Sequence, residues 1–391
     1  MGATPARAGV AVGDITPPVP VALAGYGDRD GLAESVHDRL DVRVLVLGDD
    51  DGIAMVLVVL DLLLLAPERA DPLRRAVADR LAVPVDAVLT TCVHVHGGPS
   101  TIANGDELGW PEQAHYLDQL TATTVAAAAS AARHLEPVEV AFGREDLPAG
   151  VAVNRRGHAF EPSVAVLDLV ASADGRRIAT LVGVGMHPTV AGPSNRTVST
   201  DWVGPCRRAL EAAEGGVALV VQGCGGDVNP AVTSWEDGDP AAWAPVASSV
   251  GASVAATAAA ALSSARAVPV GLERRPVRWS TVPLDPATLL SGLYGGGGRD
   301  VELHEWRIGD VTVLSVPGEG FHHLEQAVRA NRGDRVLLVG LAPDWHGYLP
   351  VPFEEGYEES LSYGPGAVSI IGAALVEPVD ADDRHPAASH R

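Results

Sequence analysis

The chain has 391 residues, 47% of them hydrophobic, which suits one large globular domain or two of average size. Its 50 acidic and 28 basic residues give a formal net charge of −22, and every basic residue is an arginine because the sequence contains no lysine. An acidic chain without a basic stripe is a poor partner for nucleic acid or for an anionic membrane, so we expect neither.

Cysteine content and the N-terminal residues bear on the cellular compartment. Three widely spaced cysteines form neither a disulfide framework nor a Cys-x-x-Cys zinc site, which favours a reduced protein. The first residues contain no apolar signal-peptide region. The longest apolar run, residues 53–65, is interrupted by Asp61 and is too short to span a bilayer. We therefore expect a cytoplasmic protein without an integral membrane segment, while its oligomeric state stays open.

Strand-like and helix-like segments alternate along the first half of the chain. Short apolar runs rich in β-branched residues predict strands, and longer stretches with helical periodicity predict helices. A turn at residues 49–52, which read Asp-Asp-Asp-Gly, joins the first two of these strands. The predicted strands are residues 43–47, 53–60, 87–92, 138–143 and 177–182, and the predicted helices are residues 70–81 and 111–134.

The second half continues this alternation without an internal repeat or a clear linker. Residues 200–213 predict a helix with Thr200 or Asp201 as its N-cap. No Gly-x-Gly-x-x-Gly, Walker A or Gly-x-Ser-x-Gly motif is present, which argues against a dinucleotide site, a P-loop and a serine-hydrolase elbow. The pattern favours an α/β fold with a mixed β-sheet core flanked by helices. The further predictions are strands at residues 217–221, 311–316 and 336–341, helices at 241–266 and 321–331, an extended segment at 268–280 and a loop at 295–298.

The most informative segment is residues 93–99, which read Val-His-Val-His-Gly-Gly-Pro directly after the predicted strand at 87–92. Side chains alternate along a strand, so His94 and His96 at its end would share one face and could converge on one ion or on a substrate beside it. Zinc favours imidazole ligands. The alternative is two partly buried histidines that are hydrogen-bonded to backbone carbonyls.

Three later predicted strands also run into side chains that can bind a metal. His187 follows the strand at 177–182 and lies between Met and Pro, and Glu319 follows the strand at 311–316 after a Pro-Gly pair. The third strand leads into residues 342–348, which read Ala-Pro-Asp-Trp-His-Gly-Tyr. Each of these could be an ordinary loop residue when taken separately. Their recurrence at strand ends favours a shared site at the edge of a sheet.

Several short motifs follow one another in an order that is more specific than any one of them. They are residues 9–18, 23–26, 37–40, 94–99, 153–156, 186–189, 199–201, 222–230 and 316–319. In this order they resemble the neutral/alkaline, non-lysosomal ceramidases, which are zinc-dependent amidases. The resemblance extends over residues 8–375. It implies a ceramidase-like metallohydrolase domain at residues 1–376, and we expect residues 377–391 to form a disordered tail.

The resemblance implies a Zn²⁺ site and its ligands. In that family two histidines, a glutamate and a tyrosine hold the zinc. Tyr357 and Tyr363 lie near enough in the sequence to be alternatives for the tyrosine ligand. Carried over residue by residue, the four ligands are His94, His187, Glu319 and Tyr348.

The resemblance also implies residues on the substrate side of the zinc. His96 would face the substrate, Arg155 would hold the substrate carbonyl or head group, and Tyr363 would be a substrate-side tyrosine. Asn229 stands where the family has a serine, which excludes a serine nucleophile at that position. The sequence also ends where a ceramidase would continue into a C-terminal sandwich domain. We therefore expect a hydrolase that differs from a membrane ceramidase.

The expected chemistry survives the loss of the serine. Zinc with an open coordination position activates water for attack on an amide or ester carbonyl. His96 could stabilise the developing oxyanion or protonate the leaving amine, and Asn229 could donate its amide N–H to the same oxyanion. Three aspartates are candidates to orient the histidines, although each could instead be a helix cap or turn former. They are Asp61, Asp201 and Asp227.

These features predict a zinc-dependent hydrolase that cleaves an amide C–N bond of a small or medium substrate. One alternative is acyl transfer or cyclisation in specialised metabolism by the same zinc site. A second alternative is a metal-binding relic without turnover, which the complete ligand set disfavours and the change at Asn229 favours. The sequence does not identify the substrate.

Overall fold

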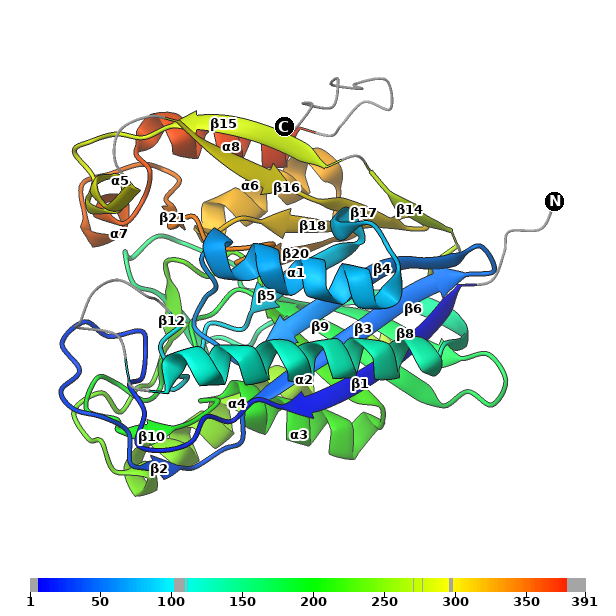
Figure 1. The fold of residues 1–391 in the computed structure, drawn as a ribbon, viewed down its shortest axis with the longest axis horizontal. Helices are drawn as coiled ribbons and strands as arrows, with labels where there is room; N and C mark the ends of the chain where they lie inside the picture. The colour runs from blue at the N-terminus through cyan, green and yellow to red at the C-terminus, as the bar shows by residue number, and fades with distance from the viewer. Residues whose placement is uncertain are drawn as a thin grey trace.

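The computed structural model in Figure 1 describes residues 6–101, 110, 112–269, 271–275, 277–294 and 298–377. The predicted disordered tail lies outside the described residues except for Glu377. Residues 295–297 of the predicted loop at 295–298 also lie outside them.

A large mixed β-sheet forms the centre of the fold, as the sequence predicted. Its neighbouring strands run antiparallel except for two parallel pairs, β11 with β9 and β4 with β5. Strand β13 pairs with β6 beside the main path. The strands, in their order across the sheet, are β11 (Val217–Gln222), β9 (Arg177–Val184), β8 (Ser163–Ala171), β6 (Glu136–Asp146), β1 (Arg7–Asp14), β3 (Asp41–Asp49), β4 (Gly52–Leu60) and β5 (Val88–Cys92), with β13 at Arg266–Ala267.

Four helices cover one face of this sheet. Helix α2 lies on β1 and β3, α4 lies on β6 and β8, and α1 and α3 pack beside them. Glycines allow this close packing: a Cβ atom at Gly9 would lie 2.2 Å from the Ala131 carbonyl oxygen in α2, and one at Gly143 would lie 2.0 Å from that of Ala261 in α4. The helices are α1 (Pro67–Leu81), α2 (Gln113–Arg133), α3 (Val203–Glu214) and α4 (Pro240–Ser263).

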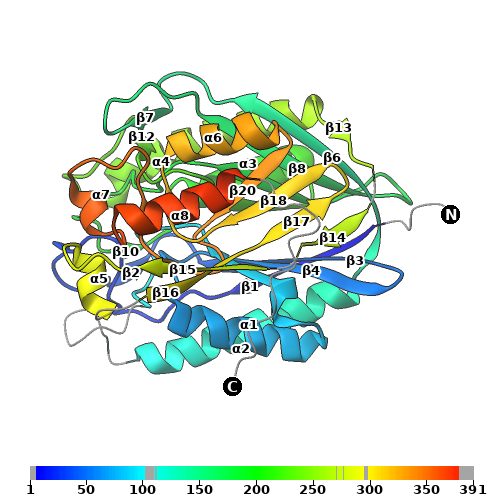
Figure 2. The same cartoon turned by 90° about the horizontal axis from the view of Figure 1, so that it is seen from above.

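A second sheet packs on the opposite face of the large sheet and makes the fold layered (Figure 2). Leu45, Leu57 and Leu181 of the large sheet meet Trp306 and Val313 of the second. Helices α6 and α8 lie outside the second sheet, together with the hairpin of β15 and β16. These elements are β14 (Leu272–Arg274), β17 (Glu305–Ile308), β18 (Val311–Val316), β20 (Val336–Gly340), α6 (His322–Arg332), α8 (Pro365–Val376), β15 (Arg278–Pro283) and β16 (Gly298–Leu303).

The two edge strands of the large sheet, β11 and β5, come together at their carboxyl ends. Gln222, the last residue of β11, donates its side-chain amide to the carbonyl of Val93, just after β5, at 3.0 Å. Strand β20 of the second sheet contacts both edge strands. Polar residues that follow several distant strands therefore meet at one place. Short strands lie near it: β7 (Ala152–Asn154) with β12 (Val228–Pro230), and β19 (Glu319–Gly320) with β21 (Tyr348–Leu349).

Helix α4 is the one helix among the described residues that is long and apolar enough to cross a membrane, with a mean hydropathy of 1.5 over 18 residues. Its residues Trp243, Val254 and Ala258 are buried in the protein core, where the helix packs on α3 and on β6. A core helix of an α/β protein passes the same test of length and composition. Helix α4 therefore gives only weak evidence for a membrane span.

Several local predictions need correction. Neither Thr200 nor Asp201 caps α3, which begins at Val203 without a side-chain cap. Asp201, whose backbone is left-handed at a φ of 53°, instead accepts backbone N–H groups from Val190, Ala191 and Trp202. The extended segment predicted at 268–280 contains β14 and the start of β15, which belong to two different sheets.

Candidate metal centre

His94 reaches the site through a turn and not through the pleat of a strand. Strand β5 ends at Cys92, and His94 has a left-handed backbone with a φ of 67°. Its backbone N–H donates to the Leu62 carbonyl at 3.0 Å, and its ring Nδ1 lies 2.9 Å from the Leu63 carbonyl oxygen. The prediction that strand alternation places His94 and His96 on one face is therefore wrong, because neither residue lies in the strand. The turn brings the two rings together instead.

His187 is held in the same way from the other edge of the sheet. It follows β9, and its backbone N–H donates to the Val228 carbonyl at 2.9 Å. Its Nδ1 lies 2.8 Å from the Gly225 carbonyl oxygen. Trp202 donates its indole N–H to the His187 carbonyl at 3.0 Å. Both ends of the residue and its ring are therefore fixed.

Glu319 comes from the second sheet and joins the two histidines. It begins β19 after Gly318, and its Oε2 lies 3.1 Å from Nε2 of His94 and 3.1 Å from Nε2 of His187. Its other oxygen accepts the indole N–H of Trp345 at 2.9 Å. Burial opposes the charge of Glu319, but the two histidines outweigh this and hold its pKa well below the ordinary value.

The chemistry of this donor set fits a metal ion. A carbonyl oxygen only accepts, so the Nδ1 atoms of His94 and His187 must donate, and each Nε2 that faces Glu319 can then hold either a proton or a metal ion. Two imidazole nitrogens and a carboxylate are the donors that zinc takes in catalytic sites. The small cavity that they line, with Gln222 beside them, has room for one ion or water molecule.

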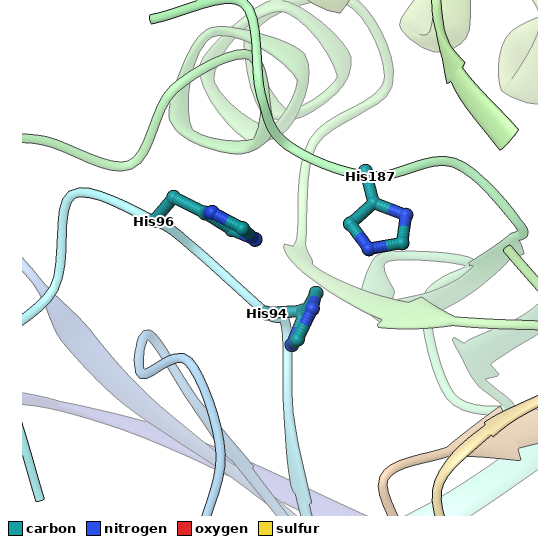
Figure 3. A group of neighbouring side chains, drawn as sticks. All are labelled: His94, His96 and His187. Carbon is teal, nitrogen blue, oxygen red and sulfur yellow. The ribbon is translucent and has the colours of Figure 1, made fainter. Parts of the chain in front are cut away.

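His96 completes a group of three imidazoles (Figure 3). One ligand atom from each of His94, His96 and His187 lies within 4.8 Å of the others, and the three rings face a common centre. The His96 ring packs 4.7 Å from the ring of Tyr26, and neither of its nitrogens has a hydrogen-bond partner. Burial lowers its pKa well below the ordinary value, so the ring is neutral at pH 7.

Tyr348 is the tyrosine that the structure brings beside Glu319. The two residues are partners in the β19–β21 pair, and the buried Tyr348 hydroxyl interacts with Arg155. Burial and the nearby Glu319 raise the pKa of Tyr348 well above its ordinary value. Tyr357 is 67% exposed. Tyr363 is buried, with its hydroxyl 3.1 Å from Nδ1 of His346.

Arg155 and Asn229 contact one another at the side of the site. Arg155 follows β7, and its Nη1 lies 3.4 Å from Oδ1 of Asn229. The remaining nitrogens of the guanidinium donate to Glu358 and to the Gly226 carbonyl. Internal partners thus engage the guanidinium of Arg155, and its contact with a substrate stays a prediction.

The three aspartates proposed to orient the histidines have other partners. Backbone carbonyls of Leu63 and Gly225 hold the rings of His94 and His187. Asp61 forms a buried pair with Arg207 at 2.6 Å, and Asp201 holds backbone N–H groups. Asp227 accepts the side-chain amide of Asn154 at 2.6 Å and the backbone N–H of His322 at 2.8 Å. The orienting role predicted for them is therefore wrong in its direct form.

Sequence reasoning missed two neighbours of the site. Trp345 donates to Glu319, and Tyr26 packs on His96. Both lie in segments that the sequence had singled out, residues 23–26 and 342–348. Their contacts join segments far apart in the chain, and no local pattern reports such contacts.

The protein is thus of the layered α/β class, with a candidate metal centre of three histidines and a glutamate where the edge strands of the large sheet meet. The sequence model of the neutral/alkaline non-lysosomal ceramidases, N-terminal region, matches residues 7–240, and the chain belongs to this family. The predicted resemblance and fold class are thereby confirmed. The family is one of amide hydrolases. A search of the curated proteins found no match.

Solved structures show the same fold. The crystal structure of neutral ceramidase from Pseudomonas aeruginosa is 20% identical in sequence, with a TM-score of 0.78 over 95% of this chain and 74% of that chain. The structure titled as ceramidase complexed with C2 is 18% identical and has the same TM-score of 0.78, over 95% of this chain and 74% of that chain. At this level of identity the similarity concerns the fold.

Proposed function

We propose that the chain is a zinc-dependent hydrolase that cleaves an amide C–N bond of a small or medium substrate. One observation carries the proposal: both Nε2 atoms of His94 and His187 lie 3.1 Å from one oxygen of the buried Glu319. Membership of an amide hydrolase family supports the reaction class. The formal charge of −22 favours a substrate other than a lipid in an anionic membrane.

His94, His187 and Glu319 would hold the zinc, with Tyr348 beside Glu319 as the candidate fourth ligand. When bound, zinc supplies Lewis-acid polarisation of the carbonyl and activation of water. The hydrogen bonds from both Nδ1 atoms to backbone carbonyls fix the ring orientations before any ligand arrives. This preorganisation limits the reorganisation that the reaction requires.

His96 is the residue that would move a proton. It is buried beside both histidine ligands, it is neutral at pH 7, and neither ring nitrogen has another partner. A neutral imidazole can accept a proton and pass it to the nitrogen of the leaving amine. Asn229 has its side-chain oxygen toward Arg155 and would donate through Nδ2 to the developing oxyanion.

A cytoplasmic location is part of the same proposal. The three cysteines of the chain, Cys92, Cys206 and Cys224, are all buried as free thiols. Free thiols persist in a reducing compartment, which supports this location.

The test is a substrate panel with the purified 391-residue chain. Zinc-loaded protein, chelator-treated protein and chelator-treated protein with zinc restored are each incubated with N-acyl amines, N-acyl amino acids and a short-chain ceramide. Free acid and free amine are measured by mass spectrometry. We expect cleavage that is lost on chelation and restored by zinc. Equal cleavage with and without metal would contradict the proposal, and acylated amines as products would favour acyl transfer.

A further inference from the structure

A second group of possible metal ligands lies outside the site described above. It consists of His158 in the loop after β7, Asp227 between β11 and β12, and His323 at the start of α6. One ligand atom from each residue lies within 4.8 Å of the others. We call these three residues the His158 cluster. Nothing in the proposed hydrolysis uses them.

The histidines of the His158 cluster have nitrogens without partners. Nδ1 of His158 and Nδ1 of His323 are both buried and make no hydrogen bond. The two ring centres lie 5.1 Å apart. A buried polar atom without a partner in the protein is uncommon and indicates a bound water or ion. Two such atoms beside a carboxylate favour an ion, because an ion satisfies all three groups together.

Asp227 supplies the charge that would attract this ion. Its side chain is fully buried, and among the ion pairs of the described residues none includes it. Its oxygens accept hydrogen bonds from Asn154 and from the backbone of His322, both of which are neutral donors. Buried charges are normally paired with an opposite charge or bound to a metal. The carboxylate of Asp227 therefore has no positively charged side chain as an ion-pair partner among the described residues, and a cation held with the two histidines would supply the opposite charge.

We infer that the His158 cluster binds a divalent cation of the zinc type, separate from the one proposed at His94. Two imidazole nitrogens and one carboxylate favour zinc, cobalt or nickel over magnesium and calcium, which prefer oxygen ligands. The outer nitrogen of His158 faces a carboxylate: its Nε2 lies 3.7 Å from Oε1 of the half-exposed Glu354, an ion-pair distance that is longer than a hydrogen bond.

The cation would connect three segments that build the first site. The Asp227 carbonyl accepts the backbone N–H of Arg155 at 2.9 Å. Gly225, two residues earlier, provides the carbonyl that orients His187. His323 is the second residue of α6 and lies four residues after Glu319 in the sequence. The role we assign to this cation is structural: it fixes these segments and takes no part in bond cleavage.

The test is the number of metal ions bound by the 391-residue chain, with any affinity tag removed. Chelated protein is loaded with Zn²⁺ or Co²⁺, dialysed and analysed for metal and protein. The variants are His158→Ala combined with His323→Ala, His94→Ala combined with His187→Ala, and the exposed control His115→Ala. We expect two bound ions for the wild type and the control and one for each double variant. Circular dichroism checks folding in each case.

Two outcomes would overturn the inference. One is a wild type that binds a single ion, which the His94→Ala, His187→Ala variant loses, and the other is a His158→Ala, His323→Ala variant that still binds two. A single ion that only the His158→Ala, His323→Ala variant loses would instead contradict the zinc proposed at His94. If that variant does not fold, His158→Gln alone decides, since it leaves His323 and Asp227 in place and should still lose the second ion. Loss of the second ion with the first retained separates this inference from the proposed hydrolysis, whose failure would show in the His94 and His187 variant.

Discussion

His94 shows how one backbone conformation builds the site. A left-handed backbone at a residue other than glycine is costly, on the order of 1–3 kcal/mol, and such residues cluster at functional sites. Here the turn allows two histidines of one His-x-His segment to face the same centre. The period-two argument reached the correct pair of residues through a geometry that the chain does not adopt.

Glu319→Gln tests the carboxylate ligand. The amide keeps the size of the side chain and can still accept from Trp345, but it removes the negative charge between the two Nε2 atoms. We expect loss of most of the zinc at this site and of the activity, with the fold retained because the core does not depend on this charge. Zinc analysis and circular dichroism measure this. The control is Glu34→Gln, at a side chain that is 80% exposed. Full zinc occupancy in Glu319→Gln would remove Glu319 from the ligands.

His96→Ala separates proton transfer from metal binding. If His96 moves a proton, its loss should lower kcat by about 10²–10⁴ while zinc remains bound. Asn229→Ala, which removes one oxyanion donor, should cost about 10²–10³. Steady-state kinetics on zinc-quantified protein provide the measurement. Unchanged turnover in both variants, with the metal retained, would show that the chemistry depends on other residues.

The residue types of the site were predictable because they follow strands and belong to short motifs. His94, His187, Glu319 and Tyr348 lie together in the structure, and their metal-binding role stays a prediction. The carbonyl partners of the rings could not be predicted, because a backbone carbonyl carries no sequence signature. The left-handed turn at His94 was also hidden, since a positive φ is uncommon at any residue other than glycine, even at histidine, where it is enriched.

At the scale of elements, the close contact of α4 with β6 depends on one missing methyl group. Gly143→Ala would place a Cβ atom 2.0 Å from a backbone oxygen of α4, which cannot move without shifting the helix. We expect a loss of about 1–3 kcal/mol in the free energy of unfolding, from denaturant titration. Gly271→Ala is the matched control, because no atom lies within 4 Å of its Cβ position. Equal stability of the two variants would contradict this packing argument.

A buried ion pair between Arg74 and Glu302 joins α1 to β16 and makes the free energy of unfolding depend on pH. Burial opposes the charge of Glu302, but hydrogen bonds from Arg74 and His304 outweigh it and lower its pKa to about 2. Because the folded pKa lies below the ordinary value of 4.5, the pair stabilises the protein above about pH 4.5. This contribution is lost as the pH falls toward 2.

Glu302→Gln should therefore lower the free energy of unfolding by about 3 kcal/mol at pH 7, since it leaves the buried Arg74 charge with only the half-exposed Asp71, 3.6 Å away, as an ion-pair partner. The difference from the wild type should shrink between pH 5 and pH 3. Urea titrations across this range measure both effects. The control is Glu273→Gln. The Glu273 side chain is 56% exposed and pairs with Arg275, so this change should lower the free energy of unfolding by less than about 1 kcal/mol at any pH. A difference that is independent of pH would contradict the assignment.

Most elements were predictable from hydrophobic periodicity, and their pairing was not. Strands β3, β4, β5 and β9 agree with the predictions to within a few residues. The prediction missed β8, although its buried residues 163–171 read as an apolar run. The second sheet was also missed, because β18 and β20 pair across a helix and β17 is only four residues long. Such pairings depend on long-range packing that local patterns do not encode.

At the scale of the whole molecule, a metal ion would connect the two sheets. His94 and His187 follow strands of the large sheet, whereas Glu319 follows β18 of the second. A ligand that binds only the folded state adds about 2.7 kcal/mol at one hundred times its Kd. We therefore expect chelation to lower Tm by several degrees and zinc to restore it.

Calorimetry of the wild type and of Glu319→Ala measures this contribution. The zinc-dependent change in Tm should be smaller in the variant, and what remains belongs to the His158 cluster. An equal change in both proteins would show that zinc does not connect the sheets through Glu319.

The separation of these residues along the chain also sets an order in time. Protein synthesis adds roughly 5–20 residues per second, so His94 emerges roughly 10–50 s before Glu319. From the synthesis of His187 until that of Glu319, a nascent chain carries both histidines without their carboxylate. The β18 strand that leads to Glu319 also needs β20, which is made later still. The proposed metal would thus be acquired late in synthesis, and a chain released before Glu319 is made would lack the complete set of proposed ligands.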